Sequence, residues 1–167
     1  MRQQHRVLVV TLLGIMVGCG PSPDAQLEAN KQVVRRFVEA QNEGDIETIR
    51  ELVAPNAVRH CQATPDVQVR SREDFITFYE DYMASFSNPR QTIDLLVAEG
   101  DMVAVLATFS GRQDGPMGPF PPSGRDVDGK FLVIIRLEAG MIAEWWVEWD
   151  NLTMLTQLGH FPPPESE

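Results

Sequence analysis

The order of two hydrophobic periodicities is the feature that most constrains the fold of this 167-residue chain. Apolar side chains recur every three or four positions in the N-terminal half, a spacing typical of amphipathic helices. Beyond Pro89 the period shortens to two, which is typical of strands. Helices followed by two hairpins predict an α+β fold, in which a curved antiparallel sheet packs on three N-terminal helices and leaves a cone with a cavity between them. The predicted helices are 25–41, 46–54 and 72–86, and the predicted strands are 57–61, 91–98, 102–110, 127–138 and 141–150.

The first twenty residues have the pattern of a bacterial lipoprotein leader. Arg2 and Arg6 begin it, and an apolar run over 7–17 is too short to span a bilayer but fits the apolar region of a secretory signal. Gly18-Cys19 then resembles a lipobox, in which the cysteine is acylated and becomes the mature N-terminus. The alternative is an ordinary secretory leader with a chance cysteine.

We therefore expect an exported, membrane-anchored lipoprotein of the cell envelope. Gly20 after Cys19 favours the outer membrane, with the protein facing the periplasm. The expected parts are a signal peptide (1–18), a tether (19–26), one domain (27–160) and a disordered tail (161–167).

The composition argues against several classes of partner. A formal net charge of −10 disfavours nucleic acid and electrostatic docking on anionic lipid, so the lipid anchor is the one membrane contact expected. Cys61 has no intramolecular partner once Cys19 is acylated, so no disulfide is expected. His60 and His160 are the only histidines after the leader and form no metal-ligand spacing. We expect neither a metal nor a cofactor.

The third helix carries an aromatic stripe. Phe75, Tyr79, Tyr82 and Phe86 follow one another at spacings of four, three and four, so they share one helix face. Such a stripe packs either into the core or along a pocket wall, and the sequence leaves both open. The stretch 111–124 is rich in glycine and proline and predicts a long loop.

The last predicted strand separates charged from apolar side chains. If its acidic face meets solvent, it is simply the polar side of an amphipathic strand. If that face meets the cavity, repulsion and desolvation raise the carboxylate pKa values and favour a general base. Alternation places Ile142, Glu144, Trp146, Glu148 and Asp150 on the acidic face, and Ala143, Trp145, Val147 and Trp149 on the other.

The same strand begins a longer pattern. Residues 142–146 read Ile-Ala-Glu-Trp-Trp, and Asp150 and Gln157-Leu158-Gly159 follow. This arrangement resembles the C-terminal signature of the SnoaL-like polyketide cyclases, also called ester cyclases. The resemblance covers about residues 28–160. Other similar segments, in order, are Asn42–Asp45, Ala54–His60, Phe86, Leu96–Ala104 and Pro121–Arg125.

This resemblance implies the cone-shaped α+β barrel of the nuclear-transport-factor-two-like superfamily, with a small hydrophobic ligand and a possible homodimer. It also implies a cofactor-free aldol ring closure in which Asp150 acts as acid and base. Glu148 is a candidate perturber of the Asp150 pKa, and His60 lies at the cavity rim or wall. The expected pocket residues are Trp146, Glu144, Tyr79, Tyr82, Phe109, Phe120 and Gln113.

One position departs from the family pattern. Arg112-Gln113 stands where many members have Thr-His, and glutamine cannot shuttle a proton near neutrality. Three functions remain open: an acid/base enzyme acting on a small carbonyl compound, a cell-envelope module that binds without turnover, and an assembly domain. In the last of these, Trp145 and Trp149 are expected to form an outer partner surface.

Overall fold

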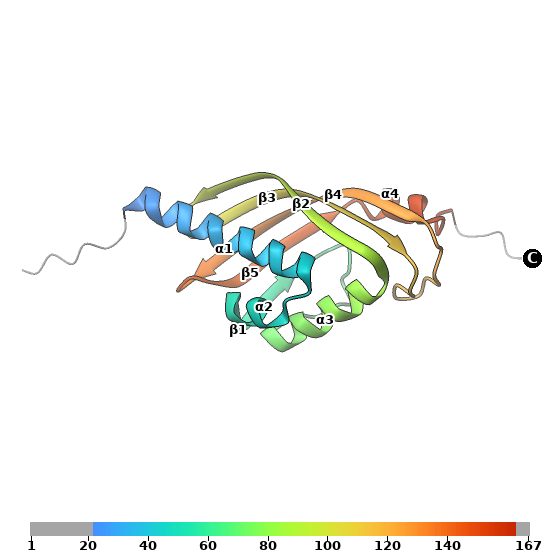
Figure 1. Cartoon of the computed structure of the whole chain (residues 1–167), viewed down its shortest axis with the longest axis horizontal. Helices are drawn as coiled ribbons and strands as arrows, with labels where there is room; N and C mark the ends of the chain where they lie inside the picture. Colours follow the sequence, from blue (N-terminus) through green and yellow to red (C-terminus); the bar gives the residue numbers. More distant parts are fainter. Residues whose placement is uncertain (1–21, 163–167) are drawn as a thin grey trace, which may run out of the picture.

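The computed structural model describes residues 22–162. Five strands form one sheet, and three helices from the N-terminal half cover one face of it (Figure 1). The predicted leader, Cys19, the first part of the tether and residues 163–167 of the tail lie outside the described residues. The elements are α1 (Pro23–Glu43), α2 (Ile46–Leu52), β1 (Val53–His60), α3 (Arg72–Ala84), β2 (Phe86–Glu99), β3 (Met102–Gln113), β4 (Asp126–Glu138), β5 (Met141–Trp149) and α4 (Asn151–Leu158).

Helix α1 begins inside the predicted tether. Ser22 caps the helix by accepting a hydrogen bond from the backbone N–H of Ala25 at 3.2 Å. Pro23 occupies the first turn, where its missing N–H is not needed. Residues 23–26 are therefore helical rather than flexible. Gly44, at a φ of 69°, ends the helix in the left-handed conformation that glycine adopts without strain.

The sheet has the order β1-β5-β4-β3-β2. Strands β2 to β5 pair antiparallel, as predicted, but β1 pairs parallel to β5, so the sheet is mixed. A parallel pair needs a long connection between its strands, and the α3–β4 segment supplies one. The α+β class is confirmed, while the barrel is not closed, because β1 and β2 remain the sheet edges in residues 22–162.

Both predicted hairpin turns are confirmed. The β2–β3 connection turns at Gly100, which has a φ of 58°. The β4–β5 connection turns at Ala139 and Gly140, with φ values of 50° and 78°. In the Ala139-Gly140 turn, positive φ at both central residues is the geometry that matches the twist of paired antiparallel strands.

The two faces of the sheet differ in what covers them. The inner face packs against α1 and α3, and its side chains form the hydrophobic core with residues such as Val34, Phe37 and Phe75. The outer face carries large apolar side chains that remain exposed. We call five of them the outer row: Leu95 (57% exposed), Val97 (52%), Leu132 (50%), Ile134 (38%) and Trp146 (36%).

Helix α4 was not predicted from the sequence. Asp150 caps its start, and Gly159, at a φ of 77°, ends it. Gln157 fastens the helix to β4, since its amide accepts from the Asp128 N–H and donates to the Asp128 carbonyl, each at 3.0 Å. None of the helices within residues 22–162 is long and apolar enough to cross a membrane.

Candidate functional site

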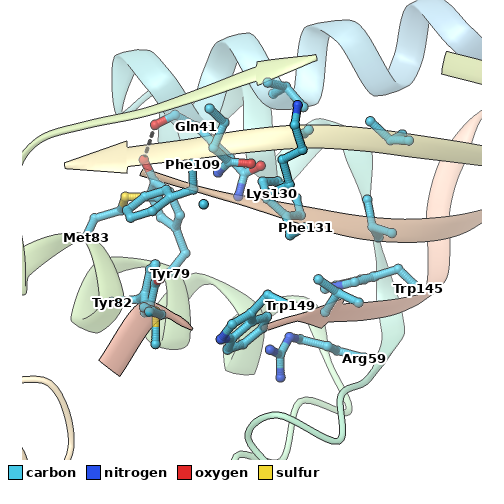
Figure 2. Close-up of a pocket in the computed structure, with 18 of the residues that line it drawn as sticks. Gln41, Arg59, Tyr79, Tyr82, Met83, Phe109, Lys130, Phe131, Trp145 and Trp149 are labelled. Carbon is cyan, nitrogen blue, oxygen red and sulfur yellow. Dashed lines mark hydrogen bonds between the residues drawn. The ribbon is translucent and has the colours of Figure 1, made fainter. Parts of the chain in front are cut away.

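A cavity of about 190 Å³ lies between the inner face of the sheet and helices α1 and α3. Figure 2 shows aromatic side chains from α3 and from β3 to β5 arranged around it. The charged side chains in its lining, within the described residues, are Arg59, Lys130 and Asp150. The aromatic lining residues are Phe37, Phe75, Phe78, Tyr79, Tyr82, Phe109, Phe131, Trp145 and Trp149.

Strand β5 presents its apolar face to this cavity. Trp145 is 5% exposed, and its ring meets the Phe75 ring edge-on at 5.0 Å between centroids. Val147 and Trp149 follow on the same side. The assembly surface expected at Trp145 and Trp149 is therefore wrong, because both side chains line the cavity.

The prediction that Glu144 and Trp146 line the pocket is also wrong. Both lie on the outer face of β5, away from the cavity. Burying carboxylates without cationic partners is costly, so the strand turns its acidic side to water. A register irregularity between Arg136 and Leu137 buries Ile142 and Ala143 together, which interrupts simple alternation near the start of β5.

Asp150 reaches the cavity because the strand ends before it. The chain leaves β5 at Trp149, and Asp150 becomes the N-cap of α4 at the edge of the cavity. Its Oδ1 accepts from the Thr153 N–H at 3.0 Å, and its Oδ2 accepts from the Thr153 hydroxyl at 2.6 Å. These hydrogen bonds lower the pKa of Asp150 below its ordinary value, so the carboxyl is ionised at neutral pH.

The aromatic stripe of α3 serves both the core and the cavity. The Tyr79 hydroxyl donates to the Gln41 carbonyl at 2.6 Å, the dashed line in Figure 2. The Tyr82 ring packs 5.7 Å from the Phe109 ring, and its hydroxyl has no hydrogen-bond partner among the described residues. Burial raises the pKa of Tyr82 above its ordinary value of 10.0, so this hydroxyl stays protonated at neutral pH. The structure places Tyr79, Tyr82 and Phe109 in the cavity wall, where the sequence put them.

His60 and Glu148 lie outside the cavity, on the outer face. The His60 ring stacks on Trp146 at 5.2 Å, and its Nε2 lies 2.8 Å from Glu144 Oε1. Arg136 donates to the other Glu144 oxygen at 3.1 Å. The hydrogen bond to His60, with that from Arg136, lowers the pKa of Glu144. Glu148 accepts from the Gln62 N–H at 2.8 Å, so neither predicted partner of Asp150 reaches the cavity.

Gln113 and Phe120 belong to a neighbouring part of the molecule. Gln113 is fully buried, its amide nitrogen donates to the Pro121 carbonyl at 3.1 Å, and its Oε1 accepts from the ring Nε2 of His160 at 2.7 Å. Phe120 stacks on His160 at 4.8 Å and lines a separate, shallow cleft. Both residues fasten the 114–125 loop rather than line the cavity, which corrects their predicted role.

Arg59 is the cavity residue that sequence reasoning missed. It pairs with Trp145 in the β1–β5 ladder, so it shares the inner face, while His60 pairs with Trp146 on the outer face. The available signal was the strand period, because one of two consecutive residues must point inward. His60 was predicted as the site residue, but it points to the outer face of the sheet rather than to the cavity. Within residues 22–162, no three His, Cys, Asp or Glu side chains are placed to hold a metal ion.

The fold and the apolar cavity define a nuclear-transport-factor-two-like cone protein. Residues 31–158 match the family model of the SnoaL-like polyketide cyclases. The chain belongs to the SnoaL-like polyketide cyclase family, as its sequence signature indicated. None of the curated proteins matches the chain in sequence.

Solved structures of several bacterial proteins share the fold. IdmH of Streptomyces antibioticus, a proposed polyketide cyclase, is 34% identical, with a TM-score of 0.69 over 78% of this chain and 98% of its own. TsrD of Streptomyces laurentii is 32% identical, with a TM-score of 0.71 over 79% and 96%. A proposed SnoaL-like polyketide cyclase of Jannaschia sp. CCS1 is 26% identical, with a TM-score of 0.75 over 87% and 100%.

Proposed function

We propose that the protein binds a small apolar carbonyl compound in its cavity and catalyses proton transfer on it without a cofactor, as in an aldol cyclisation or an isomerisation. The observation that carries this proposal is the lining of the cavity. It is apolar and aromatic, and Asp150 is its single carboxylate among the described residues. Family membership supports chemistry of the cyclase or isomerase type.

The chemistry assigns different roles to two groups. The ionised carboxylate of Asp150 accepts a proton from a carbon next to a carbonyl group. The protonated hydroxyl of Tyr82 donates a hydrogen bond to the oxygen on which negative charge then develops. In a cyclisation, the resulting carbanion attacks a second carbonyl, and Asp150 returns its proton to the new alkoxide.

The cavity volume limits the size of the ligand. A protein cavity of about 150 Å³ is large enough for benzene. The cavity here, at about 190 Å³, accommodates one aromatic ring with a small substituent. A polycyclic ligand needs movement of the aromatic wall or must extend past Asp150 into solvent.

Binding without turnover is the second candidate function, and the geometry of Asp150 favours it. Both carboxylate oxygens already accept hydrogen bonds from Thr153, and the lowered pKa makes the carboxylate a weaker base. A group held this way serves as a helix cap whether or not it reacts.

The two candidates are separated by comparing Asp150→Asn with Asp45→Asn. Asp45 caps α2 through the same two bonds to Thr48, at 3.0 and 2.6 Å, but is not part of the cavity lining. Asparagine is also a good N-cap, so each variant removes a charge while keeping a cap. The measurement is exchange of the acetophenone methyl protons in D₂O, followed by NMR.

We expect Asp150→Asn to lower the exchange rate at least about tenfold with little change in acetophenone affinity, because general-base catalysis contributes a factor of about 10²–10⁴. Asp45→Asn is expected to keep the rate. If the wild-type protein binds acetophenone but exchanges its protons no faster than buffer does, the binding module is the better description.

We propose further that the protein is exported and anchored through Cys19 to the cell envelope, at the outer membrane. The support is the pattern of Arg2, Arg6, the apolar run and Gly18-Cys19. Several acyl chains on one cysteine are enough for stable anchoring. We expect Cys19→Ala to move the protein from the membrane fraction to the soluble fraction, and unchanged membrane retention would contradict lipidation.

A further inference from the structure

We infer that Arg59 binds a carboxylate on the cavity ligand, so that the natural ligand is a small, monocyclic aromatic or similarly apolar carboxylate. This inference rests on the proposed function, since it assumes that the cavity binds a small molecule. It goes further by naming the charge and chemical class of that molecule.

Arg59 is a buried cation with few protein acceptors. The residue is 7% exposed, and both terminal guanidinium nitrogens donate to the same oxygen, Thr64 Oγ1, at 3.2 Å. It forms no ion pair with a carboxylate of residues 22–162. Burial lowers the pKa of Arg59, and its electrostatic and hydrogen-bond interaction with the Cys61 side chain, together with the charge of Glu148, opposes that effect only in part. Arginine nevertheless stays charged, so a positive charge faces an apolar space.

The remaining contacts of the guanidinium are aromatic faces. It lies 4.6 Å from the centre of the Phe78 ring and 5.9 Å from that of Trp149. Figure 2 shows the group beside Trp149 at the side of the cavity. These contacts stabilise the cation but satisfy none of its N–H groups in the plane of the fork.

The unused N–H groups border open space. No fully buried side-chain nitrogen or oxygen of the described residues lacks a hydrogen-bond partner. The Nε of Arg59 makes no hydrogen bond within residues 22–162, so it is not fully enclosed, and Arg59 is part of the cavity lining. Thr64 accepts one hydrogen bond from each terminal guanidinium nitrogen, which leaves the other N–H groups of Arg59 for a ligand atom.

The surroundings hold Arg59 in place. Trp149 donates through Nε1 to Asn151 at 2.6 Å, and Asn151 in turn donates to the Ala63 carbonyl at 2.7 Å. This chain of bonds fixes the ring beneath the guanidinium and the backbone next to Thr64. A binding group positioned before the ligand arrives loses little entropy on binding.

A carboxylate is the ligand group that fits this arrangement best. Its two oxygens match the planar fork of an arginine, and hydrogen bonds between charged partners are about twice as strong as neutral ones. The other cation in the lining, Lys130, is 63% exposed and paired with Asp94 at 2.9 Å. Arg59 is therefore the buried positive charge available to an anion. The aromatic walls and the volume of about 190 Å³ suit a ligand with one ring.

Benzoate and its neutral isostere benzamide test the inference, with calorimetric titration into the purified protein at pH 7. We expect benzoate to bind at least about tenfold more tightly than benzamide, because a charge-assisted bidentate bond replaces a neutral one. Arg59→Gln is expected to abolish this preference while leaving benzamide affinity within about twofold. Arg59→Lys, which keeps the charge but not the fork, should retain a smaller preference.

Arg136→Gln is the matched control. It removes the same charge from the outer face, where Arg136 pairs with Glu144 and Glu138, and it should keep the full preference for benzoate. Equal binding of both probes by the wild type, or an unchanged preference in Arg59→Gln, overturns the inference while leaving cavity binding intact. Absence of binding by either probe overturns the inference together with the proposed binding of monocyclic ligands. If Arg59→Gln does not fold, the wild-type ratio and Arg59→Lys decide the question.

Discussion

The two faces of β5 show how one strand divides its side chains between a cavity and a surface. The inner face presents Trp145, Val147 and Trp149 to the cavity, whereas the outer face presents Glu144, Trp146 and Glu148. Tryptophan occurs on both sides, so aromatic character alone does not mark the site. Carboxylates occur only on the outer side of the strand, where water and cationic partners solvate them.

The outer face is organised even though it is open. His60, Trp146, Glu144 and Arg136 form a continuous set of stacked, hydrogen-bonded and paired side chains. Next to it the outer row crosses the sheet in register, since Val97 pairs with Ala104, Ala104 with Ile134, and Ile134 with Trp146. The candidates for a reaction thus fall on one face, and the candidates for an interface fall on the other.

Substitution of the neighbouring tryptophans tests this division most strongly. We expect Trp145→Ala to lower the free energy of unfolding by about 3–5 kcal/mol, because it removes a buried ring that packs on Phe75. Trp146→Ala removes a ring that is 36% exposed and is expected to cost about 1 kcal/mol. Urea denaturation measures both values. Equal losses at the two positions would mean that the faces are energetically alike.

Self-association tests the outer row. The homodimer expected from the family resemblance remains a prediction, and the outer row is the apolar surface that such a dimer would cover. We expect Ile134→Asp to raise the dimer dissociation constant at least about tenfold in sedimentation experiments, because it places a charge in an apolar interface. Leu152→Asp is the control, since Leu152 is also an exposed apolar residue but lies on α4. A wild-type protein that stays monomeric at high concentration would contradict the prediction.

The dependence of the unfolding free energy on pH below neutrality tests the smallest expected effect, that of Glu144 on the outer face. The pKa of Glu144 is lowered below its ordinary value of 4.5, chiefly by the hydrogen bond to His60. A carboxyl with a lowered folded-state pKa stabilises the fold above its unfolded pKa, and that stability is lost as the pH falls through the folded value. We expect Glu144→Gln to flatten the loss of stability below about pH 4.5, by about 0.2–1 kcal/mol, as is typical of partly exposed pairs. A variant whose stability falls with pH as the wild type's does would mean that the hydrogen bonds of Glu144 to His60 and Arg136 contribute no measurable stability.

Much of the fold was predictable because the spacing of apolar residues differs between amphipathic helices and strands. Helices α1 to α3 and strands β3 to β5 lie within a few residues of their predicted limits, but β2 begins at Phe86, inside the predicted third helix and five residues before its own predicted start. Helix α4 escaped prediction because its eight residues span only about two turns, which is too short for the helical period of Met154, Leu155 and Leu158 to stand out. Its boundary residues, Asp150 and Gly159, were the available signals of a cap and an end.

The candidate site was harder to predict than the fold. Successive side chains of β5 point to opposite faces of the sheet, but the sequence does not show which of the two faces packs against the helices. Asp150 reaches the cavity for a reason outside the alternation, because the strand stops one residue before it. The role of Gln113 could not be predicted either, since its partners Pro121 and His160 meet it only after the loop and the C-terminal segment fold back.

The ends of the molecule give the cavity a direction. Helix α1 starts at one end of the long axis, and α4, whose cap is Asp150, lies at the other (Figure 1). In the lipoprotein that we propose, the acyl chains attach four residues before Pro23, so the bilayer lies at the α1 end. In that case the edge of the cavity at Asp150 faces away from the lipid, and we expect the protein to take up water-dissolved molecules from the periplasm rather than extract them from the membrane.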